Sequence, residues 1–188
     1  MTSTENVNPV SNPTPLGLFG FAVTTILLSL CNLGILDLSM VIIAVAIMLG
    51  GFAEIIAGLY ELKFGNTFAG TVFAAFGLFW LSLVLILLLP QIGGVIAADP
   101  VTIGVYLLIF GIFSLLLFIN TLKSILTFKI LMFLVTLLFL FLAVAYIIGS
   151  ALFMTLGGIV GVLAGIVGIY ISIGMIINGD WQKEVCKL

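Results

Sequence analysis

The chain has 188 residues, of which 64% are hydrophobic and only 6% are charged. A soluble globular domain carries about 25% charged residues, so the composition excludes a soluble protein and indicates an integral membrane protein surrounded by lipid. With five lysines, no arginine and no histidine, the sequence offers no basic surface for nucleic acid and few ligands for a metal or haem. We therefore expect neither a nucleic-acid partner nor a cofactor.

The first 15 residues are polar, and Glu5 is their only charge. A secretory signal peptide begins with a positively charged segment, which is missing from this stretch. We therefore expect residues 1–15 to form a short N-terminal tail ahead of a first span that is not cleaved.

Six apolar runs follow, separated by short polar or Gly/Pro breaks. Each run is long enough for a helix to cross ~30 Å of hydrocarbon, and a helix is required because lipid offers the backbone no hydrogen-bond partners. Pro90 is expected to end the third run. The six predicted spans are Leu16–Leu33, Met40–Leu62, Thr67–Leu89, Val101–Leu122, Ile130–Gly149 and Leu152–Asn178. The sequence thus predicts an all-α integral membrane protein with a six-helix domain over residues 16–178 and a C-terminal tail over residues 179–188.

The lysines are distributed asymmetrically across these spans. With six crossings, both termini lie on one side, and all five lysines fall on that side, whereas the opposite connections contain Asp37 and Asp99 but no lysine. Lysine bias in short connections marks the cytoplasmic side, so we expect a multi-pass protein of the cell membrane with both tails in the cytoplasm. Cys31 and Cys186 then lie on opposite faces, too far apart for an intrachain disulfide.

Glu54 is the clearest acidic residue at membrane depth. It lies eight residues before Leu62, the predicted end of its span. A charged group at such depth costs ~2.5–3.5 kcal/mol on insertion scales, so it usually faces a partner or a cavity. Two interpretations stay open, a structural hydrogen bond to a neighbouring helix or a pore-lining, proton-handling role. Glu61, near the helix end, is expected to form an interfacial ion pair with Lys63.

Polar residues also mark two helix starts and the first span. In the segment Asn12–Leu18, proline suits the first helical turn and a preceding Asn or Thr can cap it. The exposed amides of such a start attract anions, so this segment and Gly65–Thr67 are either plain helix starts or anion-friendly ones. Thr24, Thr25 and Asn32 serve either as interhelical hydrogen-bonding groups or as a polar lining.

Deep positive charge is missing from every predicted span. An isolated anion in a medium of low dielectric constant is very costly. A carboxylate that crosses this protein therefore relies on helix amides and hydroxyls, or crosses as the neutral acid. This favours small substrates and coupling to protons if the protein is a conduit.

The same segments resemble a known family. Asn12–Leu18 reads Asn-Pro-Thr-Pro-Leu-Gly-Leu and resembles the N-P-x-P-L-G-L signature of the acetate uptake transporter family, whose bacterial members are succinate–acetate permeases of the YaaH type. The similarity covers most of the chain. Further matching segments follow in order: Gly20-Phe21, Thr24–Ile26, Ala57-Gly58, Glu61, Gly65–Phe68, Phe79-Trp80, Gly104–Tyr106, Thr121–Lys123 and Ile169-Tyr170.

The resemblance implies a homohexamer of six-helix protomers, each with its own pore. Acetate and other small carboxylates would pass polar sites separated by a hydrophobic constriction, which by position is formed by Phe21, Phe76 and Val135. The family commonly has Tyr and Leu at the latter two positions, and relatives tend to carry Gln at the position of Glu54. Asn12, Thr24 and Asn32 match polar positions of the family. The candidate substrate path is Asn12, Thr24, Thr25, Asn32, Asn66 and Thr67.

Three classes of function follow from these features. The leading hypothesis is a membrane channel or proton-linked transporter for acetate and related small carboxylates, with succinate as a further candidate. A pore for small neutral solutes suits the missing deep cations equally well. A structural or assembly protein of the membrane without a transported solute is the third class, but it leaves the capped helix starts and the threonines of the first span unexplained. An enzyme is not expected, because no histidine is available as a base.

Overall fold

The structure is a computed structural model that describes residues 11–188 and consists of helices joined by short connections. Residues 1–10 of the expected N-terminal tail lie outside the described residues. The helices are α1 (Thr14–Asn32), α2 (Met40–Val45), the π-helix η1 (Ala46–Ala53), α3 (Glu54–Lys63), α4 (Thr67–Ile92), α5 (Pro100–Thr121), α6 (Leu126–Ile148) and α7 (Ala151–Trp181). Since α2, η1 and α3 form one continuous span, the described chain has six helices long and apolar enough to cross a membrane. The predicted all-α architecture with six spans is confirmed.

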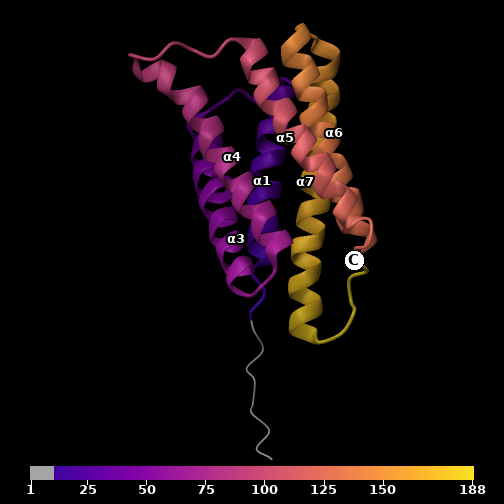
Figure 1. Cartoon of the computed structure of the whole chain (residues 1–188). Helices are drawn as coiled ribbons and strands as arrows, with labels where there is room; N and C mark the ends of the chain where they lie inside the picture. The colour runs from indigo at the N-terminus through magenta and orange to yellow at the C-terminus, as the bar shows by residue number, and fades with distance from the viewer. Residues whose placement is uncertain (1–10) are drawn as a thin grey trace, which may run out of the picture.

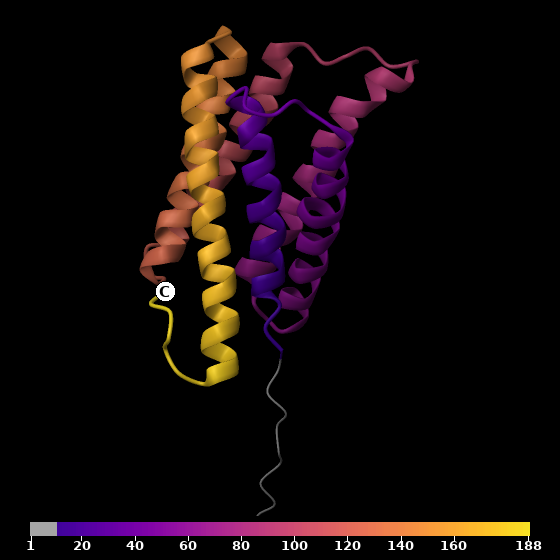
Figure 2. The same ribbon diagram turned by 180° about the vertical axis from the view of Figure 1, so that it is seen from behind.

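The helices form two neighbouring groups. In Figures 1 and 2, α1, α3 and α4 lie together on one side of the molecule, and α5, α6 and α7 lie on the other. The groups meet where α1 packs along α7. Small residues permit this close approach, because a Cβ atom added to Gly161 of α7 would lie 2.0 Å from Ser29 Oγ, and one added to Gly165 would lie 2.3 Å from Ile26 Cγ1.

The connections separate the charges at the two ends of the molecule. Asp37 and Asp99 lie on the connections at the top of Figure 1, whereas the start of α1, the α3–α4 and α5–α6 connections and the C-terminal tail lie toward the bottom. All five lysines fall at this second end. We refer to the two ends as the aspartate side and the lysine side.

Two predicted boundaries within the bundle are wrong, and the sixth span continues three residues past its predicted end at Asn178, to Trp181. Pro90 does not end the third span, because α4 continues to Ile92 and terminates at Gly93, which has a φ of +97°. A proline placed this close to the end removes a backbone hydrogen bond only from the last turns, which the helix tolerates. The fifth span begins at Leu126 instead of Ile130, because Ile125 is the extended residue that precedes the helix. Lys129 therefore lies in the first turn of α6.

The second span contains the only irregular backbone within a span of the described chain. Residues Ala46–Ala53 are wound as a π-helix, a form that is rare and is often found at functional sites. Gly50 in this segment faces the Trp80 indole of α4, and Gly20 of α1 lies against the Leu49 carbonyl. The first residue after the π-helix is Glu54.

Candidate functional site

Three cavities follow one another through the interior of the protomer. The aspartate-side cavity, of about 210 Å³, is lined by residues of α1, α4, α5 and α6. The central cavity measures about 30 Å³ and lies between α1, α3, α4 and α6. The lysine-side cavity, of about 330 Å³, is lined by residues of α1, α4, α6 and α7 and of the connections next to α4 and α6. Two large cavities thus flank a very small one.

Shared side chains show that the cavities adjoin. Phe21 and Phe76 line both the aspartate-side and the central cavity. Five apolar residues line both the central and the lysine-side cavity: Leu18, Val72, Phe73, Leu131 and Met132. The central cavity therefore lies between the other two, which share no lining residue with each other.

The predicted constriction residues meet at this narrow place. Phe21, Phe76 and Val135 all line the central cavity, and each is buried. Phe76 is held in place by a nearly parallel stack on Phe139, with ring centroids 5.8 Å apart. It also packs against Phe110 of α5. The neck is therefore bounded by rigid aromatic side chains from separate helices.

Unpartnered polar atoms lie along this route. In the part of the chain that the structure describes, Thr25 Oγ1 and Glu54 Oε1 are buried without a hydrogen-bond partner. Thr25 lines the aspartate-side cavity, together with Asn32, and Glu54 lines the central cavity. A buried polar atom without a partner costs about 1–3 kcal/mol, so a side chain kept in that state indicates a place where a ligand or water completes the bond.

Of the remaining residues of the candidate substrate path, only Asn66 lines one of the three cavities. Asn66 lines the lysine-side cavity and caps α4 by accepting a hydrogen bond from the Ala69 amide at 3.2 Å. Thr24 donates to the Gly20 carbonyl at 2.8 Å, and Asn12 accepts from the Thr14 amide at 3.0 Å. Neither of these two, nor Thr67, lines one of the three cavities.

Glu61 has a different role from the one expected. Instead of pairing with Lys63, its carboxyl oxygens accept hydrogen bonds from the Thr14 hydroxyl and from Asn66 Nδ2. Side chains two residues apart on a helix do not face each other, so the expected ion pair is geometrically disfavoured. The Lys63 ammonium group lies over the Tyr60 ring, 5.8 Å from its centroid.

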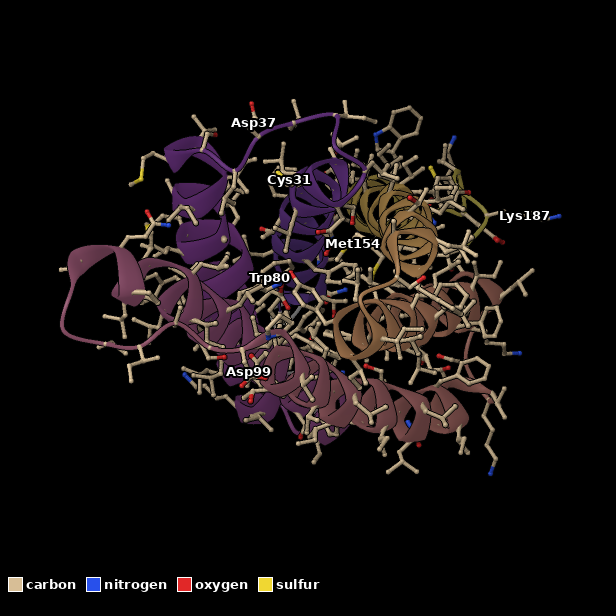
Figure 3. All side chains as sticks on the ribbon, turned by 90° about the horizontal axis from the view of Figure 1, so that it is seen from above. Cys31, Asp37, Trp80, Asp99, Met154 and Lys187 are labelled. Atoms are coloured by element: carbon tan, nitrogen blue, oxygen red, sulfur yellow. The ribbon has the colours of Figure 1, made fainter. Side chains whose placement is uncertain are left out.

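Trp80 lines the aspartate-side cavity, although the sequence did not lead us to include it in the candidate substrate path. It is buried in α4 and lies near the centre of the bundle seen along the helices (Figure 3). The available signal was its depth, since an indole N–H so far from the membrane surface needs a buried partner. Among residues 11–188, no three His, Cys, Asp or Glu side chains are grouped so as to hold a metal ion.

Comparison with known proteins places this arrangement in a family. Residues 2–182 match the GPR1/FUN34/yaaH family. The chain belongs to this family. The succinate-acetate/proton symporter SatP of Escherichia coli (strain K12) is 43% identical over 179 residues, with 95% of each chain covered. A solved structure of the bacterial acetate channel SatP superimposes with a TM-score of 0.92 at 42% identity, covering 94% of this chain and 98% of that one.

The family also includes more distant relatives with other names. The ammonia transport outward protein 2 of Saccharomyces cerevisiae is 36% identical over 172 residues, which cover 87% of this chain and 61% of the yeast protein. The family is thus one of membrane transporters and channels, and the chain is not an enzyme.

Proposed function

We propose that this chain carries acetate and other small carboxylates, with succinate as a further substrate, through a pathway inside each protomer. The observation that carries the proposal is the succession of two large cavities and one small cavity from the aspartate side to the lysine side. The SatP relatives, named for acetate and succinate, support the choice of substrate.

The side chains along this route suit a short organic acid. Thr25 and Asn32 present a hydroxyl and an amide to the aspartate-side cavity, and Asn66 presents an amide to the lysine-side cavity. These groups can donate hydrogen bonds to a carboxylate without a fixed cation. Asn12, Thr24 and Thr67 stay predicted members of the path.

The proposed constriction explains why only small molecules would pass. Phe21, Phe76 and Val135 line a cavity of about 30 Å³, the smallest of the three. A substrate therefore has to displace these side chains slightly and shed its hydration water. A two-carbon acid with one polar end meets that demand better than a larger solute.

Uptake of radiolabelled acetate into proteoliposomes tests the proposal. We expect uptake above that of empty vesicles prepared from the same lipids. Uptake no faster than in empty vesicles, with folded protein recovered from the membranes, would overturn it.

A pore for small neutral solutes is the second candidate, and the similarity to a yeast protein named for ammonia transport favours it. Swelling of the same proteoliposomes in urea and glycerol separates the two candidates. Swelling in these solutes as fast as in acetate would favour the neutral-solute pore.

The proposal includes a homohexamer in the cell membrane with both termini in the cytoplasm. The lysines at one end support this orientation. Cys31 lines the aspartate-side cavity and Cys186 lies in the C-terminal tail, so a membrane-impermeant thiol reagent applied to intact cells should label Cys31 and spare Cys186. The reverse pattern would overturn the orientation, and a native mass other than that of six chains would overturn the hexamer.

A further inference from the structure

The narrowest part of the route contains an acid with nothing bonded to one of its oxygens. Glu54 is 1% exposed and lines the central cavity with eight apolar residues. Its Oε1 atom has no hydrogen-bond partner among the described residues. The free oxygen therefore lies where a passing carboxyl group has to go.

The helices packed against Glu54 supply no charge to balance it. α1 and α4 contain no acidic or basic residue along their whole length, and Cys31 is the one titratable side chain that α1 brings to a cavity. On its own helix, Tyr60, Glu61 and Lys63 lie toward the far end, more than one and a half turns away.

Across the central cavity, α6 contributes only apolar side chains. Its titratable residues lie near its two ends, since Lys129 is in the first turn and Tyr146, which lines the aspartate-side cavity, is in the last. α7 carries Tyr170 and Asp180, and neither lines any of the three cavities. No described cation is therefore placed to compensate an ionised Glu54.

These surroundings couple a proton to any carboxylate that enters. Two carboxyl groups in contact cannot both stay ionised, so such a pair holds one proton between them. The energetic penalty for a second negative charge is larger in an apolar neck without a cation than in water. Passage of a carboxylate beside Glu54 therefore requires one proton.

We propose that Glu54 is the residue that hands a proton to each carboxylate at the neck, a role that rests on the proposed function. The Glu54 O–H bond breaks as a new O–H bond forms on the substrate oxygen, which leaves a Glu54 carboxylate and a neutral acid. The acid passes Phe21, Phe76 and Val135 and releases the proton to water on the far side. Glu54 then regains a proton from hydronium in the cavity of entry. One anion and one proton cross together, so a monocarboxylate carries no net charge.

Membrane potential provides the decisive test. In proteoliposomes with an imposed potassium diffusion potential, acetate uptake by the wild-type protein should not change with the sign of the potential. Glu54→Gln keeps a hydrogen-bond donor but has no proton to hand over, so its uptake should become several-fold faster with the interior positive. Glu184→Gln makes the same chemical change in the exposed C-terminal tail and should behave as wild type.

The outcomes separate this inference from the function on which it rests. Equal insensitivity to potential in wild type and Glu54→Gln overturns the role of Glu54, as does a wild-type uptake that depends on potential. Complete loss of uptake in folded Glu54→Gln, with uptake restored in Glu54→Asp, supports an obligatory proton transfer. Wild-type uptake that does not exceed that of empty vesicles overturns the proposed function itself.

A measurement on the wild-type protein keeps the inference testable if the variants do not fold. Dicyclohexylcarbodiimide is apolar and adds to protonated carboxyl groups, so it should modify Glu54 from the membrane, and mass spectrometry would locate the adduct. Acetate should slow this modification, because it occupies the same cavity. An unmodified Glu54, or a rate unaffected by acetate, would overturn the inference.

Discussion

Asn66 donates a hydrogen bond from Nδ2 to Glu61 Oε2 at 2.8 Å across the connection between α3 and α4. The other oxygen of the same carboxyl accepts from the Thr14 hydroxyl in the first turn of α1. Thr14 and Asn66 also line the lysine-side cavity. A single buried acid thus fixes the starts of two helices at one mouth of the proposed route.

Removing that acid should loosen this end of the protein. Glu61 is only 4% exposed, and Glu61→Ala leaves two donors without their acceptor. We expect the free energy of unfolding to fall by about 2–3 kcal/mol, measured by unfolding in detergent micelles. Glu61→Gln keeps one acceptor oxygen and should lose about half as much. Glu184→Ala, in the exposed tail, is the control, and a loss as large as that of Glu61→Ala would contradict the prediction.

Thr25 should matter for transport and not for stability. Its buried hydroxyl has no partner, so Thr25→Val replaces it by a methyl group without breaking a hydrogen bond, and stability should stay the same or rise by about 1 kcal/mol. Acetate uptake should fall about tenfold, because a hydroxyl donor in the aspartate-side cavity is lost.

Thr136→Val is the matched control for Thr25. Thr136 is equally buried, but its hydroxyl donates to the Met132 carbonyl at 2.8 Å. Thr136 lines none of the three cavities. Its replacement should leave acetate uptake unchanged. Uptake that falls equally in both variants would show that the Thr25 hydroxyl has no specific role.

The spans were predictable because lipid imposes a length and a composition on each of them. The start of the second and third spans, at Met40 and Thr67, is found where expected, since a polar or glycine-containing break precedes each one. The predicted end of the third span before Pro90 and the predicted start of the fifth span at Ile130 were wrong, because a proline in the last turn and a lysine in the first turn are both compatible with a helix.

The site was predictable only in part. Glu54 could be singled out from the sequence because an acid at membrane depth is costly. The direction of its side chain depends on the π-helix before it, which the sequence pattern did not predict. The ion pair expected for Glu61 was wrong for a related reason. The partners of Glu61 are set by tertiary packing, since its donors come from α1 and from the cap of α4.

Asp99 should make the start of α5 sensitive to pH. Its carboxyl accepts hydrogen bonds from the Thr102 hydroxyl at 2.5 Å and the Thr102 amide at 3.0 Å. These bonds lower the pKa of Asp99 below its ordinary value. The cap is therefore fully present above the ordinary Asp pKa of about 3.9 and is lost as the pH falls through the lower value of the folded protein.

Hydrogen exchange provides the measurement for Asp99. After correction for the intrinsic exchange rate, protection of the Thr102 amide should decrease over that acidic range in the wild-type protein. In Asp99→Asn, which cannot ionise, it should not. Protection that depends on pH equally in both proteins would contradict a titrating cap.

Phe21 should determine which carboxylates pass. Its ring lines both the aspartate-side and the central cavity, so Phe21→Ala widens the neck, and uptake of butyrate relative to acetate should rise several-fold. Phe21→Leu keeps more of the side-chain volume, so it should raise the butyrate-to-acetate ratio by less. It also serves as the test if the alanine variant is too unstable, since a buried Phe→Ala change costs about 3–5 kcal/mol of stability. Phe133→Ala removes a ring that is 47% exposed on α6 and lines none of the three cavities, so it should leave the ratio unchanged. A ratio that is the same in the Phe21 and Phe133 variants would mean that selection by size happens elsewhere along the route.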